Sequence, residues 1–157
     1  MTTIAIDALG NIAADSRATC GNEISRDDVD KIILTHGRIY ALAGAGALTA
    51  PLIAWHHAGA DPTKLPICKD CNWSLIVVDD NGIYCYNDRV PYAVANAYEP
   101  PVAFGSGQDW ALGAMLAGKS AKEAVEIACK VDINSGGKVM AVNIADTLAP
   151  KLKEAAE

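Results

Sequence analysis

The residues best suited to chemistry in this sequence begin with Thr2, directly after Met1. If Met1 is removed, Thr2 carries a hydroxyl group and a free α-amine on one residue. That pairing is one of the few ways in which a threonine becomes a useful nucleophile, because the amine can act as the adjacent base. An α-amine has an ordinary pKa of about 7.7–8.0, so an appreciable fraction is free base near neutrality. Thr2 is therefore a candidate nucleophile for acyl transfer through an ester intermediate.

Three distant segments could support this chemistry: Ala14-Asp15-Ser16-Arg17-Ala18-Thr19, the single Lys31, and Asp132-Ile133-Asn134-Ser135-Gly136-Gly137. A lysine ammonium close to Thr2 would favour the neutral amine and the ionised hydroxyl. Each segment also has an ordinary structural explanation when it is taken alone. The segment Ala14–Thr19 could be a turn that closes a strand, and Lys31 could be a solvated charge. The segment Asp132–Gly137 could be a helix end followed by Gly136.

A fourth segment, Gly105-Ser106-Gly107, reads alone as a turn from a strand into a capped helix. It does not match the Gly-x-Ser-x-Gly nucleophile elbow of the α/β-hydrolases. Its interest lies in its order relative to the other segments.

Alternation of apolar residues and turn signals predict the elements that must position these side chains. The predicted strands are Thr2–Asp7, Asn11–Asp15, Lys31–Thr35, Ile39–Ala43, Trp73–Val78, Ile83–Tyr86, Val102–Phe104 and Lys138–Asn143. The predicted helices are Ala47–Ala58, Asp109–Ala117, Ala121–Val131 and Asp146–Ala156. Ser120 and Glu123 form a capping-box pattern before the third helix. Strands, a helix, strands and then a helix pair favour one α+β domain over residues 1–157.

Charge and hydropathy exclude several classes of protein. The formal net charge of −6 argues against a surface that binds nucleic acid or anionic membranes. The longest uncharged stretch, Ile39–Trp55, is interrupted by Gly44, Gly46 and Pro51, so it does not read as a membrane span. The N-terminus lacks a basic region followed by an apolar run. We therefore expect a cytoplasmic protein.

The chain has five cysteines, which we expect to be buried thiols and not a disulfide framework. Cys20, Cys85 and Cys129 read as small buried residues. Cys68-Lys69-Asp70-Cys71 is a single pair, to which His56-His57 could add a ligand, but no second pair stands at a zinc-site spacing. We expect no metal and no cofactor.

The order of these motifs resembles that of the β-type subunits of the proteasome family. Thr2-Thr3-Ile4 is similar to the mature N-terminus of that family. Gly105-Ser106-Gly107-Gln108 is similar to the family's segment before its helix pair. The resemblance covers Thr2–Ala47 and Val102–Val142, and length and layout are close to those of bacterial HslV-type peptidases. It implies the N-terminal-nucleophile hydrolase fold, a four-layer αββα sandwich.

The resemblance also implies a role for each matching residue. Thr2 would attack, Lys31 would lower the effective pKa of its hydroxyl, and Asp15 would orient Lys31. Asp132, Ser135 and Ser106 would position the amine and its water, and the Gly44 N–H would stabilise the oxyanion. Arg17 belongs to the same motif as Asp15. The residues that would line an apolar substrate pocket are Ala18, Thr19, Val29 and Leu42.

The function implied by the resemblance is that of a threonine-type endopeptidase. It would hydrolyse unfolded polypeptides or peptides inside a closed homo-oligomeric ring, with an unfolding ATPase as partner. Two alternatives stay open: a catalytically silent protein of this fold used for assembly or binding, and a small-molecule amidohydrolase. The family has two long helices where Ala47–Gly59 supplies one. Because the loop Asp61–Asn72 has few apolar residues, we expect a neighbouring subunit to cover Ala47, Ile53, Ala54 and Trp55.

Overall fold

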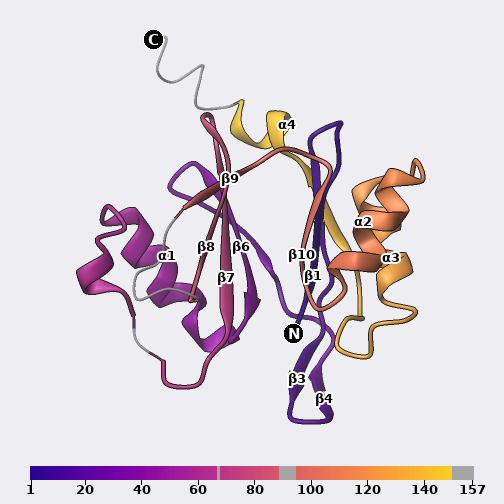
Figure 1. Cartoon of the computed structure of the whole chain (residues 1–157), viewed down its shortest axis with the longest axis horizontal. Coiled ribbons are helices and arrows are strands. Elements are labelled where there is room, and N and C mark those ends of the chain that lie inside the picture. Colours follow the sequence, from indigo (N-terminus) through magenta and orange to yellow (C-terminus); the bar gives the residue numbers. More distant parts are fainter. Residues whose placement is uncertain (67, 89–94, 150–157) are drawn as a thin grey trace.

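Short antiparallel strands form three sheets in the computed structural model, which describes residues 1–66, 68–88 and 95–149 (Figure 1). The strands are β1 (Thr3–Ile6), β2 (Asn11–Ala14), β3 (Ala18–Cys20), β4 (Glu23–Arg26), β5 (Ile32–Thr35), β6 (Arg38–Gly44), β7 (Trp73–Asp79), β8 (Gly82–Asn87), β9 (Asn96–Tyr98), β10 (Val102–Gly105) and β11 (Met140–Asn143). The helices are α1 (Thr49–His57), α2 (Gln108–Leu116), α3 (Ala121–Ala128) and α4 (Ile144–Leu148), with 3₁₀ turns η1 (Gly46–Leu48) and η2 (Pro62–Lys64).

Two of the sheets pack against each other through branched apolar side chains. One sheet has the strand order β10-β1-β2-β11 and the other the order β5-β6-β7-β8-β9. Ile4, Ile6 and Ile12 of the first sheet share a buried cluster with Ile39 and Ile76 of the second. Because successive strand residues point to opposite faces, Ala5 and Ala13 lie on the outer face of the first sheet.

Helices cover the outer faces of both sheets. α2 and α3 pack on the four-stranded sheet, where Ala5 and Ala13 contact a cluster rich in alanine. The residues on the helix side are Ala111, Met115, Ala121, Ala124, Val125 and Ala128. α1 packs on the five-stranded sheet through Leu52 and Trp55. Figure 1 shows α1 at the left, α2 and α3 at the right, and the two sheets between them.

The expectation that a neighbouring subunit must cover the first helix was wrong for its two largest residues. Ile53 is 8% exposed and Trp55 is 6% exposed within the single chain. The Trp55 indole donates to the Asp61 carbonyl at 2.7 Å, and Leu65 packs against the same cluster. The following loop therefore folds back over the helix, and of the four residues named in the expectation only the small Ala47 and Ala54 are exposed.

The predicted hairpins and the capping box are confirmed, whereas the strands β3, β4 and β9 were not predicted. Ser120 and Glu123 bond to each other's backbone at the start of α3. The β3–β4 hairpin was not predicted, because its exposed residues show no apolar alternation. β9 is likewise short and mostly exposed. The predicted C-terminal helix begins earlier, as α4, and its residues 150–157 lie outside the described residues.

The cysteine expectations were partly wrong. Cys68 and Cys71 are bonded to each other in the loop before β7, because the turn at Asp70 brings the two side chains together. Cys20 is exposed on the projecting β3–β4 hairpin, Cys129 is partly exposed and Cys85 is buried. Among the described residues, no helix combines the length and apolar character needed to cross a bilayer.

Candidate active site

Thr2 directly precedes β1, the strand between β10 and β2, and is 3% exposed. Its hydroxyl donates to the Met1 carbonyl oxygen at 2.6 Å. Gly105 of β10 stands opposite Thr3 with φ 95°, and a Cβ there would collide with the Thr2 carbonyl oxygen. A glycine at this position therefore lets β10 approach the backbone of the candidate nucleophile.

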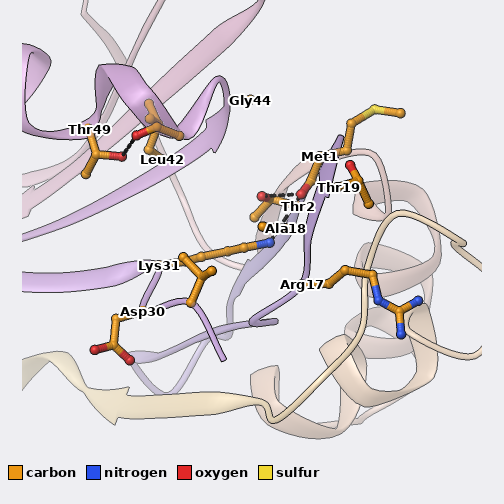
Figure 2. A pocket seen from close by; sticks show the side chains of 12 residues that line it. Met1, Thr2, Arg17, Ala18, Thr19, Asp30, Lys31, Leu42, Gly44 and Thr49 are labelled. Carbon is orange, nitrogen blue, oxygen red and sulfur yellow. Dashed lines mark hydrogen bonds between the residues drawn. The ribbon is translucent and has the colours of Figure 1, made fainter. Parts of the chain in front are cut away.

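Lys31 and Asp15 form a buried ion pair beside Thr2. Asp15 follows β2 in one sheet and Lys31 precedes β5 in the other, yet Nζ lies 2.8 Å from Oδ1. The Lys31 ammonium also donates to the Met1 carbonyl oxygen at 3.2 Å. Figure 2 shows the Thr2 hydroxyl and the Lys31 ammonium meeting at that one oxygen atom. The packing of the two sheets thus brings the predicted nucleophile and the predicted cation together.

The Asp15 carboxylate is fully buried and satisfied by four donors. Oδ1 accepts from the Thr3 N–H at 3.0 Å and from Lys31, and Oδ2 accepts from the Arg17 N–H at 3.1 Å and the Gly136 N–H at 2.9 Å. Burial lowers the pKa of Lys31 below its ordinary value, while the charge of Asp15 opposes that shift. Asp15 therefore orients Lys31 and favours its charged form.

A second buried carboxylate, Asp132, accepts hydrogen bonds from two serine hydroxyls. Ser106 and Ser135 each donate to its Oδ2 at 2.6 Å. Burial would raise the pKa of Asp132, but the hydrogen bonds from these serines and from Asn134 together outweigh it and hold the pKa below its ordinary value. Ser106 Oγ lies 3.4 Å from the Thr2 carbonyl oxygen, and Ser135 Oγ lies 2.7 Å from Thr3 Oγ1. The predicted serines thus meet at Asp132, and they contact the chain at Thr2 and Thr3.

The charges of Lys31, Asp15 and Asp132 act on the N-terminal amine of Met1. Burial and the nearby Lys31 charge lower the pKa of the Met1 α-amine below 8.0, while Asp15 and Asp132 oppose this shift. A neutral amine is the form that can accept a proton. The electrostatic environment at this end of β1 therefore favours a base.

The four predicted substrate-binding residues line one cavity beside Thr2. It measures about 220 Å³, and Ala18, Thr19, Val29 and Leu42 share its walls with Lys31, Gly44 and Thr2. Asp30, Gly46 and Thr49 also line it and were not predicted, because nothing in their local sequence distinguishes them from turn and helix-start residues. A second cavity of about 690 Å³ lies beside Thr2, lined in part by Asn72, Trp73 and Ser106.

Gly44 lies where these two cavities meet. Its φ is 114°, and a Cβ there would collide with the Asn72 carbonyl oxygen, which accepts from the Ala45 N–H at 3.2 Å. Both the backbone conformation and the close approach of the loop require glycine at this position. The predicted oxyanion donor therefore lies at the junction of the two spaces that a bound substrate could occupy.

The structure does not bring the Arg17 guanidinium to the nucleophile. It pairs with Asp27 at 2.8 and 3.2 Å and donates to the Ile133 carbonyl at 3.3 Å. Figure 2 shows it turned away from the Lys31 ammonium. A Cβ at Gly136 would collide with the same guanidinium. Arg17 therefore links the segment after β2 to the loop that carries Asp132 and Ser135.

No protein-family model and no curated protein matches the sequence. Solved structures do match in fold. The structure of Thiobacillus denitrificans BPH in complex with Epoxomicin is 17% identical with a TM-score of 0.68, over 90% of this chain and 97% of that chain. The structure of Thiobacillus denitrificans BPH is 19% identical with a TM-score of 0.65, over 90% of this chain and 96% of that chain. The chain shares the fold of these proteins.

Proposed function

We propose that the chain is an N-terminal threonine peptidase, built as the four-layer αββα sandwich of the N-terminal-nucleophile hydrolases. The observation that carries the proposal is the contact of the Thr2 hydroxyl and the buried Lys31 ammonium with one carbonyl oxygen, at 2.6 and 3.2 Å. A hydroxyl held beside a cation is stabilised as it loses its proton. Cleavage of the Met1–Thr2 bond would add a free amine to the same residue.

In the proposed reaction, the Thr2 hydroxyl passes its proton to the Thr2 α-amine, directly or through water, and attacks a substrate carbonyl carbon. The Gly44 N–H stabilises the tetrahedral oxyanion, a contribution of about 3–4 kcal/mol for one such donor in acyl transfer. The scissile C–N bond of the substrate then breaks, and the Thr2 α-amine gives its proton to the amine of the leaving peptide fragment. Water hydrolyses the ester and restores the Thr2 hydroxyl.

The smaller of the two cavities beside Thr2 suits a small apolar side chain on the substrate residue that forms the ester with Thr2. Its walls include the methyl and isopropyl groups of Ala18, Val29 and Leu42. The two basic residues at its edge, Lys31 and Arg17, are already paired with Asp15 and Asp27. We propose that these apolar walls receive the side chain before the scissile bond, and that substrates are peptides or unfolded polypeptides.

The structural neighbour that binds Epoxomicin, a proteasome inhibitor, suggests the first test. Protein prepared with Thr2 at its N-terminus, checked by intact mass, should cleave fluorogenic peptides and gain the mass of one epoxomicin. Thr2→Ala should do neither, whereas Thr2→Ser keeps a hydroxyl and should retain part of the activity. Protein that keeps Met1 should be inactive, because the amine then lies in a peptide bond.

Two results would contradict this function. One is turnover by protein in which Met1 is wholly retained. The other is a folded protein with Thr2 exposed that neither cleaves peptides nor forms an adduct, which would favour the silent assembly or binding protein. Hydrolysis of small amides without cleavage of peptides would favour the amidohydrolase.

A further inference from the structure

Thr3 joins the two buried carboxylate clusters of the candidate site. It is fully buried, and its two donor groups, the backbone N–H and the hydroxyl, bond in different directions. The backbone N–H donates to Asp15 Oδ1 at 3.0 Å, on the side of Lys31. The hydroxyl lies 2.7 Å from Ser135 Oγ, on the side of Asp132.

The direction of these hydrogen bonds follows from counting protons. Ser135 has one hydroxyl proton, which it donates to Asp132 Oδ2 at 2.6 Å. Thr3 Oγ1 must therefore donate to Ser135 Oγ, so the chain of donors runs from Thr3 through Ser135 to Asp132. A hydroxyl that accepts a hydrogen bond becomes a stronger donor to its own acceptor. The Thr3 hydroxyl thus helps to neutralise the Asp132 charge.

Packing confines the Thr3 hydroxyl to this position. Gly107 faces it from the turn before α2, and a Cβ on Gly107 would collide with Thr3 Oγ1 and lie 3.1 Å from the Ala128 Cβ. The branched threonine side chain has few χ1 rotamers available on a strand. The absence of a side chain at Gly107 therefore makes the space in which the hydroxyl can reach Ser135.

We propose that Thr3 is a positioning residue for the Thr2 nucleophile, an inference that rests on the proposed function. Thr3 is the first residue of β1 and is bonded from both sides, so it fixes the backbone that leads into Thr2. Through Ser135 it also bonds to Asp132, one of the charges that act on the N-terminal amine of Met1. Thr3 therefore couples the geometry of the hydroxyl to the basicity of the amine.

The test uses Thr3→Val in full-length protein with Thr2 at the N-terminus. Valine keeps the shape and strand preference of threonine. Ser135 keeps its bond to Asp132, so only one hydrogen bond is lost and the fold should survive. We expect kcat to fall between about 10-fold and 100-fold, the scale of a small misplacement of a reacting group, with KM little changed. Thr3→Ser, which restores the hydroxyl, should recover most of the loss.

Two further variants test whether the effect depends on the Thr3 hydroxyl. Gly107→Ala should lower kcat in the same way, because its methyl group displaces the Thr3 hydroxyl from the other side. Thr147→Val is the matched control. It removes a hydroxyl of α4 that lies outside the site and donates to the Asn143 carbonyl at 2.6 Å. Its kcat should equal that of the wild type.

The second readout is the pKa of the Thr2 α-amine, measured from the pH dependence of its acylation by mass spectrometry. This measurement does not require a functioning enzyme. In Thr3→Val the hydrogen bonds that disperse the Asp132 charge are weaker, so the pKa of the Thr2 α-amine should rise. Thr147→Val should leave that pKa unchanged.

Equal amine pKa values in wild type and Thr3→Val would overturn the positioning role, as would a Thr3→Ser variant no better than Thr3→Val. A loss of kcat that only follows the loss of folded protein would also overturn it. A wild type without turnover or adduct would reject the proposed peptidase, while the amine measurement would still decide the role of Thr3.

Discussion

At the scale of single residues, the candidate site consists of two buried carboxylates with very different partners. Asp15 accepts three backbone N–H groups in addition to the Lys31 ammonium. Asp132 accepts two serine hydroxyls at Oδ2, and at Oδ1 the backbone N–H and the side-chain amide of Asn134. The backbone donors to Asp15 come from β1, from the segment after β2 and from the loop before β11, so Asp15 ties these parts of the chain together. The two hydroxyl donors to Asp132 can exchange protons with their surroundings, which suits a group near the proposed proton-transfer path.

Lys31→Met should remove peptidase activity by at least about 100-fold, because the cation beside the hydroxyl is lost while the side-chain length is kept. Asp15 retains its three backbone donors, so we expect a loss of stability of about 1–3 kcal/mol, which is less than a fully orphaned buried charge would cost. Asp15→Asn should lose more, because its amide group would face N–H donors. Urea unfolding together with peptide turnover measures both effects, and an active Lys31→Met protein would contradict the assignment.

The pH dependence of kcat/KM should report the N-terminal amine. Burial and Lys31 lower the pKa of the Met1 amine below 8.0, and we expect the same direction for the Thr2 amine after cleavage. Because the neutral amine is the base, activity should rise with pH through a midpoint below 8.0. Circular dichroism across the same pH range is the control for unfolding. A midpoint above 8.0 would show that the amine is not shifted in this direction.

At the scale of elements, Asp7 ties the first hairpin to the helix pair. Its carboxylate accepts from the Leu9 and Asn11 N–H groups at 3.0 Å and from the Ala121 N–H at the start of α3 at 2.9 Å. A carboxylate at a helix N-terminus also interacts favourably with the helix dipole. This one side chain therefore sets the position of α3 on the sheet, and with it the chain that continues to Asp132.

Asp7→Asn should destabilise the protein by about 1–3 kcal/mol at neutral pH, because one amide N–H₂ must face backbone donors. Burial would raise the pKa of Asp7, but its hydrogen bonds outweigh that and hold the pKa below 3.8. Its contribution is therefore complete above pH 3.8 and lost as pH falls through the lower, native-state pKa. Urea unfolding from neutral pH to pH 3 should show a weaker acid dependence in Asp7→Asn than in the wild type.

The exposed residue Asp80 supplies the matched control for this measurement. Asp80→Asn should leave both the stability and its acid dependence close to those of the wild type. An Asp7→Asn protein as stable as the Asp80→Asn protein would show that the carboxylate does not hold the hairpin to α3.

At the scale of the whole molecule, the exposed apolar side chains gather away from α1. Trp110 and Leu116 on α2 are 47% and 71% exposed. Ile24, Val131 and Ile133 are also exposed, and they border a groove of about 480 Å³ between the β3–β4 hairpin and the end of α3. Exposed apolar patches of this kind often mark protein interfaces. The predicted assembly therefore rests on these surfaces and no longer on the first helix.

We expect light scattering at micromolar concentration to report a mass well above the 16.4 kDa of one chain. The double variant Trp110→Glu/Leu116→Glu should dissociate, because charges would replace the exposed apolar face of α2. Leu34→Glu is the control, since Leu34 is 53% exposed on the other sheet. A stable and active monomer of the wild type would contradict the ring assembly and favour the amidohydrolase.

Local signals in the sequence were sufficient for most elements. The Asn81-Gly82 turn, the Ser120–Glu123 capping box and the alternation in Thr2–Asp7 depend on residues a few positions apart. Such short-range rules act wherever the segment lies in the fold, so they can be read without a structure. The exposed β3–β4 hairpin carries no such signal and was found only in the structure.

The sequence by itself also determined which side chains could do chemistry, since a threonine able to become N-terminal, a lysine and two aspartates stand in a recognisable order. Tertiary structure alone decided that Lys31 reaches Asp15 across two sheets and that Ser135 turns to Thr3, 132 positions away. It also decided that Ile53 and Trp55 are covered within the chain. These contacts depend on sheet packing and on a loop folding back, which join residues too distant for any local pattern to relate.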